Sequence, residues 1–220
     1  PVRRGRQCAW PRSGGKLRAF GVPIFHCTHA DILARYLQWQ DSTTPAEREA
    51  LSPRSSAAAQ PPASAGNQSQ ESWPPYEWVQ DWRREHDDRV HNVGWMERQR
   101  RELPPYDIAT PMRPRPGDLL VASREQFHRL LIGRRQRVLC HMGFETDECL
   151  QFKPYGIANM QSLGYLCLVV RDCTATYEMA ETLGGCWKTR LAIDSIEARW
   201  GYSHGSQGLL EVVRRAQDHL

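Results

Sequence analysis

The chain has 220 residues, of which 40% are apolar, and a formal net charge of +4. This length suits one α/β domain with a sizeable core, or two small domains. No apolar run approaches the roughly 18 residues of a membrane-spanning helix, and residues 1–16 lack the apolar stretch of a signal peptide, so no membrane association is expected.

Arg residues alternate with acidic residues, which is typical of a solvated helix face rather than of a nucleic-acid surface. The seven cysteines are an odd number and include no CxxC pair. This usage favours reduced thiols in the cytoplasm over a disulfide framework or a zinc ribbon. We therefore expect a cytoplasmic protein that does not bind nucleic acid.

In chain order, the first predicted elements are a helix end, a strand and a helix. Residues 15–22 are typical of a helix closed by Gly21. Residues 23–30 predict a short buried strand that opens into a loop. Apolar residues three or four apart over 30–40 then predict a second helix.

Two segments of unusual composition follow. Residues 41–72 are mostly Ser, Ala, Pro, Gln and Thr, which predicts a disordered insertion because little apolar area can be buried there. Residues 73–117 are rich in Trp, Arg and Pro and predict an extended or turning excursion over the surface. Its aromatic residues could line a ligand pocket, although the favoured alternative is that they anchor this segment to the rest of the protein. They are Trp73, Tyr76, Trp78, Trp82 and Trp95.

After Asp118, strands and helices alternate. Strands are predicted over 119–123, 137–143 and 165–173, and helices over 124–134 and 147–164 and near 178–198 and 206–217. Short loops between them predict βαβ units with a parallel sheet, whose strands are apolar because both faces are covered. The predicted fold is a three-layer α/β/α sandwich with a mainly parallel, Rossmann-like sheet, formed by residues 1–220 as a single domain.

The stretch GFETDEC, residues 143–149, leaves the 137–143 strand and enters a helix. In open parallel sheets the ligand crevice lies at such carboxyl ends. Free N–H groups and the dipole at a helix start lower the pKa of a thiol, and they can also stabilise an oxyanion. Cys149 is therefore a candidate nucleophile, with Thr146 or Asp147 as helix cap. The alternative is a buried thiol that only packs.

This stretch resembles the isochorismatase-like cysteine hydrolases, which include isochorismatases, nicotinamidases and carbamoyl-amide hydrolases. Their hallmark is Gly-apolar-x-Thr-x-x-Cys before a helix, then Gly-Tyr and a strand that ends in Asp-Ala or similar. The matching residues are Gly143, Phe144, Thr146, Cys149, Gly164, Tyr165 and Asp172. RAFGVPIFHCTHA and RPGDLLVAS are also similar to the family, and the likeness covers most of 15–40 and 112–213.

The resemblance implies that Cys149 attacks an electrophilic carbon. It also implies a cis peptide bond between Phe144 and Glu145, with the amides of Glu145 and Cys149 as the oxyanion hole. The family's catalytic Asp and Lys have no match, because residues 1–15 contain no acidic residue and Arg124 follows the strand where the Lys belongs. Lys153 could lower the pKa of Cys149, although a solvated surface charge is the favoured alternative, and Arg124 could supply positive charge.

Nicotinamidase-like members bind a metal through an Asp and several His. His26, His29 and Asp31 lie at the corresponding strand end and are weak candidates, so neither a metal nor another cofactor is expected. Because many family members form dimers or tetramers, a homo-oligomer is expected by analogy only.

Two main functions follow. The first is a cysteine hydrolase acting on a small-molecule amide or a related C–N or C–O substrate, either a divergent family member or a truncated one whose Asp-bearing strand lies ahead of residue 1. Loss of the Asp argues against activity, because general-base assistance is worth about 100- to 10,000-fold. The second is a catalytically inactive family member that serves as a binding or assembly protein. A weaker third function is a scaffold that recruits partners through its Trp-rich segment and the predicted disordered insertion.

Overall fold

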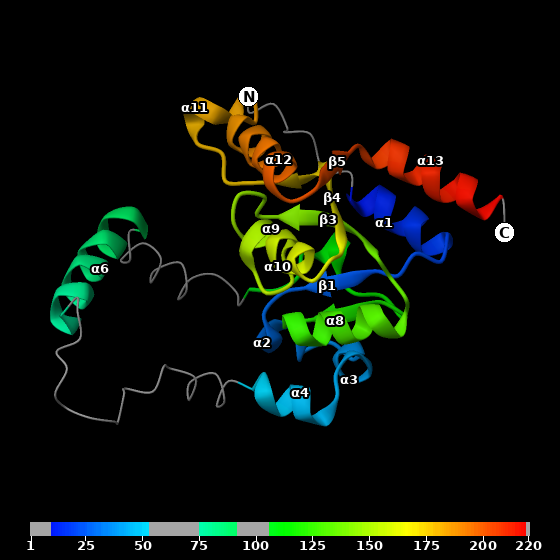
Figure 1. The fold of residues 1–220 in the computed structure, drawn as a ribbon, viewed down its shortest axis with the longest axis horizontal. Coiled ribbons are helices and arrows are strands. Elements are labelled where there is room, and N and C mark those ends of the chain that lie inside the picture. The colour runs from blue at the N-terminus through cyan, green and yellow to red at the C-terminus, as the bar shows by residue number, and fades with distance from the viewer. Residues whose placement is uncertain (1–9, 53–74, 92–105, 219–220) are drawn as a thin grey trace. The chain divides into compact units, whose positions relative to one another are not determined.

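A computed structural model describes residues 10–52, 75–91 and 106–218. The chain has two compact units: Pro1–Ser52 with Ala109–Leu220, and Pro53–Ile108. The larger unit holds every strand of the described residues (Figure 1). The six cysteines in the described residues are free thiols. None of the described helices combines the length and the apolar character that crossing a membrane requires.

All strand pairs are parallel, as the alternation of strands and helices predicts. β1 (Phe25–Cys27) pairs with β2 (Leu119–Val121). The second sheet has the order β3 (Val138–Phe144), β4 (Leu166–Ala175), β5 (Tyr202–His204). Within the described residues no ladder joins these two groups, so the expected single sheet is two hydrogen-bonded sheets.

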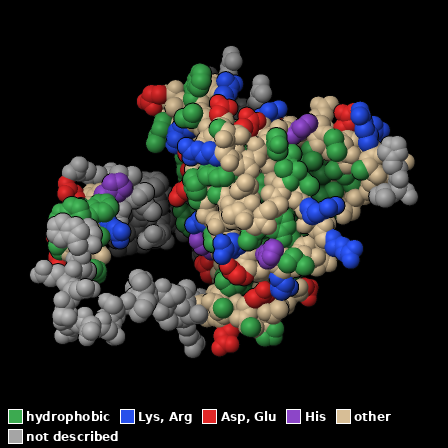
Figure 2. Space-filling model, in the orientation of Figure 1, with side chains coloured by type: hydrophobic (Ala, Val, Ile, Leu, Met, Phe, Trp, Pro, Cys, Tyr) green, Lys and Arg blue, Asp and Glu red, His purple; other side chains and the backbone are tan. Residues whose placement is uncertain are grey.

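Helices cover both faces of the three-stranded sheet, which gives the predicted three layers. α10 (Ile157–Ser162) and α12 (Trp187–Arg199) contact β4 on one side. α13 (Ser206–Gln217) contacts β4 on the other side, where α1 (Trp10–Ala19) packs on α13 (Figure 1). On the visible face of the larger unit, acidic and basic side chains are interspersed (Figure 2).

One hydrophobic core spans both sheets. Its buried side chains come from β2, β3, β4, α8 (Arg124–Gly133), α10 and α12, and include Val121, Phe127, Leu131, Leu139, Ile157, Met160, Val169 and Ile196. Phe25 and Cys27 of β1 pack against the same cluster. Burial of apolar surface therefore holds β1 and β2 to the rest of the unit, where backbone pairing does not.

Several predicted helices are interrupted, and local chemistry explains the clearest break. The helix predicted over 147–164 is α9 (Cys149–Phe152) followed by α10. Pro154 cannot donate a helical hydrogen bond, and the preceding Lys153 is extended, with φ −60° and ψ 159°. At Gly156 a Cβ atom would lie 2.7 Å from the backbone oxygen of Gln151, so the turn into α10 requires glycine.

Two other predicted helices are also divided. Residues 30–40 hold α2 (Ala30–Leu33) and the start of α3 (Gln38–Ser42), and residues 178–198 hold α11 (Ala180–Leu183) and most of α12. Gly184 and Gly185 lie between α11 and α12, where their high backbone entropy disfavours a continuous helix.

The expected disorder from residue 41 is wrong for residues 41–52. They contain the end of α3 and all of α4 (Pro45–Ala50). A capping box stabilises α4: the Thr44 hydroxyl accepts from the Glu47 N–H, and the Glu47 carboxylate accepts from the Thr44 N–H. Glu47 also accepts two hydrogen bonds at 2.7 Å from Arg129 of α8. Residues 53–72 lie outside the described residues.

In the smaller unit, residues 76–91 form α6 (Tyr76–His91), so an extended path is wrong there. Arg residues that alternate with acidic residues predict a solvated helix face, and residues 81–86 of α6 are exposed. Trp78 and Trp82 are exposed, their ring centroids lie 6.3 Å apart, and Arg83 lies 5.6 Å from the Trp82 ring. Trp73 and Trp95 lie outside the described residues.

Candidate active site

The turn after β3 has the backbone geometry that places Cys149. Gly143 has φ +125°, a conformation that L side chains rarely adopt. The peptide bond between Phe144 and Glu145 is cis, at the position that the resemblance implies. The Thr146 N–H then donates to the Ala175 oxygen at 3.0 Å. The turn is therefore tied to the end of β4.

Thr146 is fully buried and stabilises this turn through hydrogen bonds. Its hydroxyl lies 2.7 Å from the Thr174 hydroxyl, which donates to the Gly143 oxygen at 2.9 Å. Because the Thr174 proton is used in that bond, Thr146 is the donor to Thr174. The Gln151 amide donates to the Thr146 oxygen at 2.8 Å. Thr146 does not cap the helix, whose N-cap is Glu148.

Cys149 is the first residue of α9 and is half-buried. Burial raises the pKa of its thiol above the ordinary value, and the charges of Glu148 and Glu145 raise it further. The charge of Lys153 and a hydrogen bond from the Glu145 backbone act in the opposite direction and do not cancel this rise. The expectation of a lowered pKa is therefore wrong. α9 has only four residues, so its dipole is short, and its start is acidic.

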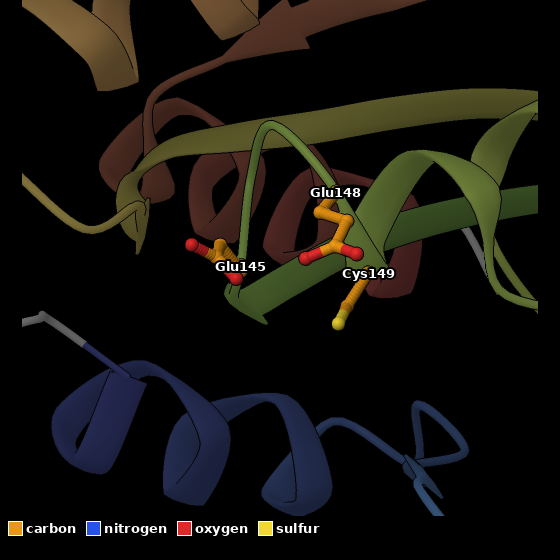
Figure 3. Close-up of side chains that lie close together, drawn as sticks. All are labelled: Glu145, Glu148 and Cys149. Atoms are coloured by element: carbon orange, nitrogen blue, oxygen red, sulfur yellow. The ribbon is translucent and has the colours of Figure 1, made fainter. Parts of the chain in front are cut away.

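Two carboxylates surround this thiol. One ligand atom from each of Glu145, Glu148 and Cys149 lies within 4.8 Å of the others (Figure 3). Burial raises the pKa of Glu145, and the neighbouring charges of Asp147 and Glu148 raise it too. Within the described part of the chain this is the one group of three side chains that could share a metal ion. The same group places a carboxylate that can accept a proton near the Cys149 thiol.

The two predicted supporting cations differ in position. Lys153 follows α9, and its charge lowers the pKa of Cys149. Arg124 is the first residue of α8, and its Nε lies 3.3 Å from Glu125 in an exposed pair. The structure therefore brings Lys153 to Cys149, and it gives Arg124 a local partner on its own helix.

Tyr155 links the ends of β1 and β3. Burial raises the pKa of its hydroxyl, and interactions with both Cys27 and Cys149 raise it further. Cys27 is the last residue of β1, and burial raises the pKa of its thiol to about 12. The carboxyl ends of these two strands therefore lie at one edge of the core, as expected for parallel strands.

The predicted metal candidates at the end of β1 do not come together. His26 is buried, and its Nε2 lies 2.8 Å from the Asp118 carboxylate. Arg18 donates to the same carboxylate at 2.8 and 2.5 Å. His29 is the N-cap residue of α2, and Asp31 lies in its first turn. Side chains alternate between the two faces of β1, and that of His26 is on the buried face. These residues therefore do not fit the family's metal site.

Burial lowers the pKa of His26, although its hydrogen bond to Asp118 raises it. Burial alone would raise the pKa of Asp118, but the hydrogen bonds from Arg18, the Arg115 backbone and His26 hold it below the ordinary value. The structure thus has a neutral His and an ionised Asp there. This arrangement stabilises the fold and holds His26 Nε2 against Asp118.

Sequence reasoning missed Glu148 as a possible reactive group. The signal was present in the quoted stretch, because Glu148 is the carboxylate directly before the candidate nucleophile. It also missed Tyr155, whose place beside two thiols depends on the break after α9. No local pattern pairs Tyr155 with Cys27, which is 128 residues earlier by the difference of their numbers.

Comparison with solved structures identifies the architecture. A cysteine hydrolase from Pseudomonas syringae pv. phaseolicola 1448A matches with a TM-score of 0.53 at 13% identity, over 98% of this chain and 84% of that chain. The chain has the fold of a cysteine hydrolase. The predicted α/β fold with a parallel sheet is thereby confirmed.

A more distant match is an isochorismatase-like hydrolase from Alkaliphilus metalliredigens, with a TM-score of 0.39 and 12% identity over 48% of this chain and 57% of that chain. No protein-family model matches the sequence. No curated protein is significantly similar to it. The likeness therefore concerns the fold, and any catalytic role must be argued from the site itself.

Proposed function

We propose that the chain is a hydrolase that cleaves a small amide or a related C–N or C–O substrate with Cys149 as nucleophile. The observation that carries this proposal is the position of the thiol, half-buried at the first residue of α9, directly after a turn that hydrogen bonds fix to β4. A packing cysteine requires none of these features. The cysteine-hydrolase fold supports the same reading.

The first chemical step would form a bond between the Cys149 sulfur and the carbonyl carbon of the substrate. Negative charge would then develop on the carbonyl oxygen. The N–H of Cys149 is suited to receive it, because the first residue of a helix has no acceptor within the helix. The Glu145 amide is the proposed second donor, and the charge of Lys153 favours the thiolate.

The raised pKa of Cys149 sets a condition on this reaction. At neutral pH the thiol is almost entirely protonated, so attack requires removal of the proton as the new bond forms. A neighbouring acceptor is therefore part of the proposal. Without a proton acceptor Cys149 would be unreactive, and the alternative of a binding protein would be favoured.

The test uses p-nitrophenyl acetate with the full chain. We expect the acetyl group to be found on Cys149 by peptide mass spectrometry, with a burst of nitrophenolate. Cys149→Ala should slow the burst by at least about 100-fold. Cys140→Ala is the matched control, since Cys140 is an exposed free thiol on β3 and should not matter. Acetyl groups on Cys140 or Cys186, with none on Cys149, would refute the proposal.

A further inference from the structure

The site has a thiol that must lose a proton, and three carboxylates lie in the turn that holds it. Two of them are engaged elsewhere. Asp147 accepts from the Thr176 hydroxyl and lies 3.7 Å from the Lys188 ammonium. Glu145 lies 3.3 Å from the Thr176 hydroxyl and accepts from the Tyr177 backbone N–H. Both carboxylates are therefore held toward the segment that follows β4.

Glu148 differs from these two residues. Its side chain is exposed, and in the part of the chain that the structure describes its carboxylate makes no hydrogen bond or ion pair with another residue. It lies within 4.8 Å of the Cys149 sulfur, and Figure 3 shows the two side chains next to each other at the start of α9. Of the two glutamate charges that act on Cys149, that of Glu148 is the stronger.

We propose that Glu148 is the general base and acid of this site, a role that rests on Cys149 being the nucleophile. A carboxylate oxygen of Glu148 accepts the thiol proton while the sulfur bonds to the carbonyl carbon and the carbonyl electron pair moves to oxygen. When the tetrahedral intermediate collapses, the C–N or C–O bond breaks and the Glu148 carboxyl returns the proton to the leaving group. The product of this half-reaction is a thioester on Cys149.

The same carboxylate serves the second half-reaction. A water molecule attacks the thioester carbon, Glu148 accepts one water proton, and the C–S bond breaks. The thiolate then recovers the proton from Glu148, which restores the starting state. The other charged or titratable groups that act on the thiol are Glu145 and Lys153, and Tyr155 lies beside it. Among the carboxylates of this turn, Glu148 is the one that is both unpaired in the described structure and within 4.8 Å of the sulfur.

A base and a merely negative neighbour predict different deacetylation rates for Glu148→Gln, although both predict faster alkylation. Loss of a negative charge lowers the thiol pKa, so alkylation of Cys149 by iodoacetamide near neutral pH should become faster. Loss of the base should slow hydrolysis of the acetyl-Cys149 intermediate by about 100-fold or more. A neighbour that acts only through its charge would speed alkylation and leave that hydrolysis unchanged.

The experiment follows acetylation and deacetylation of Cys149 by mass spectrometry after a pulse of p-nitrophenyl acetate. Glu148→Asp should recover part of the deacetylation rate, because it restores a carboxylate. Asp147→Asn is the matched control: it removes one charge from the same turn and should change deacetylation less than about threefold. Circular dichroism checks that each variant is folded.

The outcomes separate the two proposals. If wild-type Cys149 is never acetylated, the hydrolase function fails, and the role of Glu148 fails with it. If Cys149 is acetylated but Glu148→Gln deacetylates as fast as wild type, Glu148 is not the base and the nucleophile stands. If alkylation speeds up and deacetylation slows in Glu148→Gln alone, both proposals hold.

Discussion

The Asp118 network at the start of β2 and the turn after β3 both carry ionisable side chains, yet they differ in how many of those groups are satisfied. At the amino end of the β1–β2 pair, the Asp118 carboxylate accepts from Arg18 and the Arg115 N–H and lies 2.8 Å from His26 Nε2. At the end of β3, two glutamates flank a thiol, and Glu148 makes no hydrogen bond or ion pair within the described residues. A closed network stabilises a fold, whereas unpaired groups are available for chemistry.

The comparison also shows why residue type alone is a poor guide to a ligand site. HCTH looks like a set of metal ligands, but the structure uses its first His to bind Asp118. DEC looks like an ordinary polar helix start, but the structure leaves its Glu and Cys side by side. Which groups remain free depends on partners that are distant in sequence, since Asp118 and His26 are 92 residues apart.

The largest predicted effect breaks the network at β1. Asp118→Ala leaves the buried His26 and the mostly buried Arg18 without their acceptor. Removing one partner of such a network typically costs about 3–5 kcal/mol of unfolding free energy. Urea unfolding followed by circular dichroism measures this loss. Glu125→Ala is the control, because the Arg124–Glu125 pair is exposed and should contribute less than about 1 kcal/mol.

If Asp118→Ala lost as little stability as Glu125→Ala, the Asp118 network would be as solvated as the surface pair. The difference between this network and the turn after β3 would then disappear. Asp118→Asn adds a graded step, because the amide keeps one oxygen as acceptor for Arg18.

The next effect in size is a loss of stability in mild acid. Burial lowers the pKa of His141 in β3 to about 4, and its Nε2 is buried without a hydrogen-bond partner in the described structure. The unfolded chain takes up this proton near pH 6.5, so stability falls as the pH drops below 6.5 toward 4. For His141 alone we expect about 2 kcal/mol less stability at pH 5 than at pH 7.

His26 acts in the same direction, because burial lowers its pKa as well. Asp118 does not contribute in this window, because a carboxyl with a lowered pKa loses its stabilising effect only below its unfolded value of about 3.9. Urea midpoints at pH 7 and pH 5 test the prediction. His141→Leu should remove most of the pH dependence, and an unchanged dependence in that variant would contradict it.

Much of the architecture follows from the sequence because it depends on local patterns. Apolar strands alternating with helices predicted the parallel ladders, and GFETDEC placed Cys149 at a strand-to-helix turn. The break between α9 and α10 was also within reach, because Pro154 and Gly156 are visible signals. The capping box at Thr44 and Glu47 is another local signal, and it was outweighed by the composition of the segment that follows.

The chemistry of the site was less predictable because it depends on burial and on distant partners. The rise in the pKa of Cys149 comes mainly from burial, which no sequence spacing reveals. The division into two sheets depends on which strand edges meet, and the strands themselves do not encode that. Likewise, the hydrogen bond between Thr146 and Thr174 joins the turn after β3 to β4, and the two residues are 28 apart in the sequence.

The smallest predicted effect sharpens the comparison at β3. Glu148→Gln should change the free energy of unfolding by less than about 0.5 kcal/mol, because an exposed side chain without a partner adds little to stability. The same variant is expected to lose deacetylation by about 100-fold, so folding and reactivity should separate at this position. Urea unfolding of wild type, Glu148→Gln and Asp118→Ala, followed side by side, measures the change in the free energy of unfolding. A loss of more than about 1 kcal/mol in Glu148→Gln would mean that its carboxylate is held in a network like that of Asp118, and a carboxylate held in that way is a poor proton shuttle.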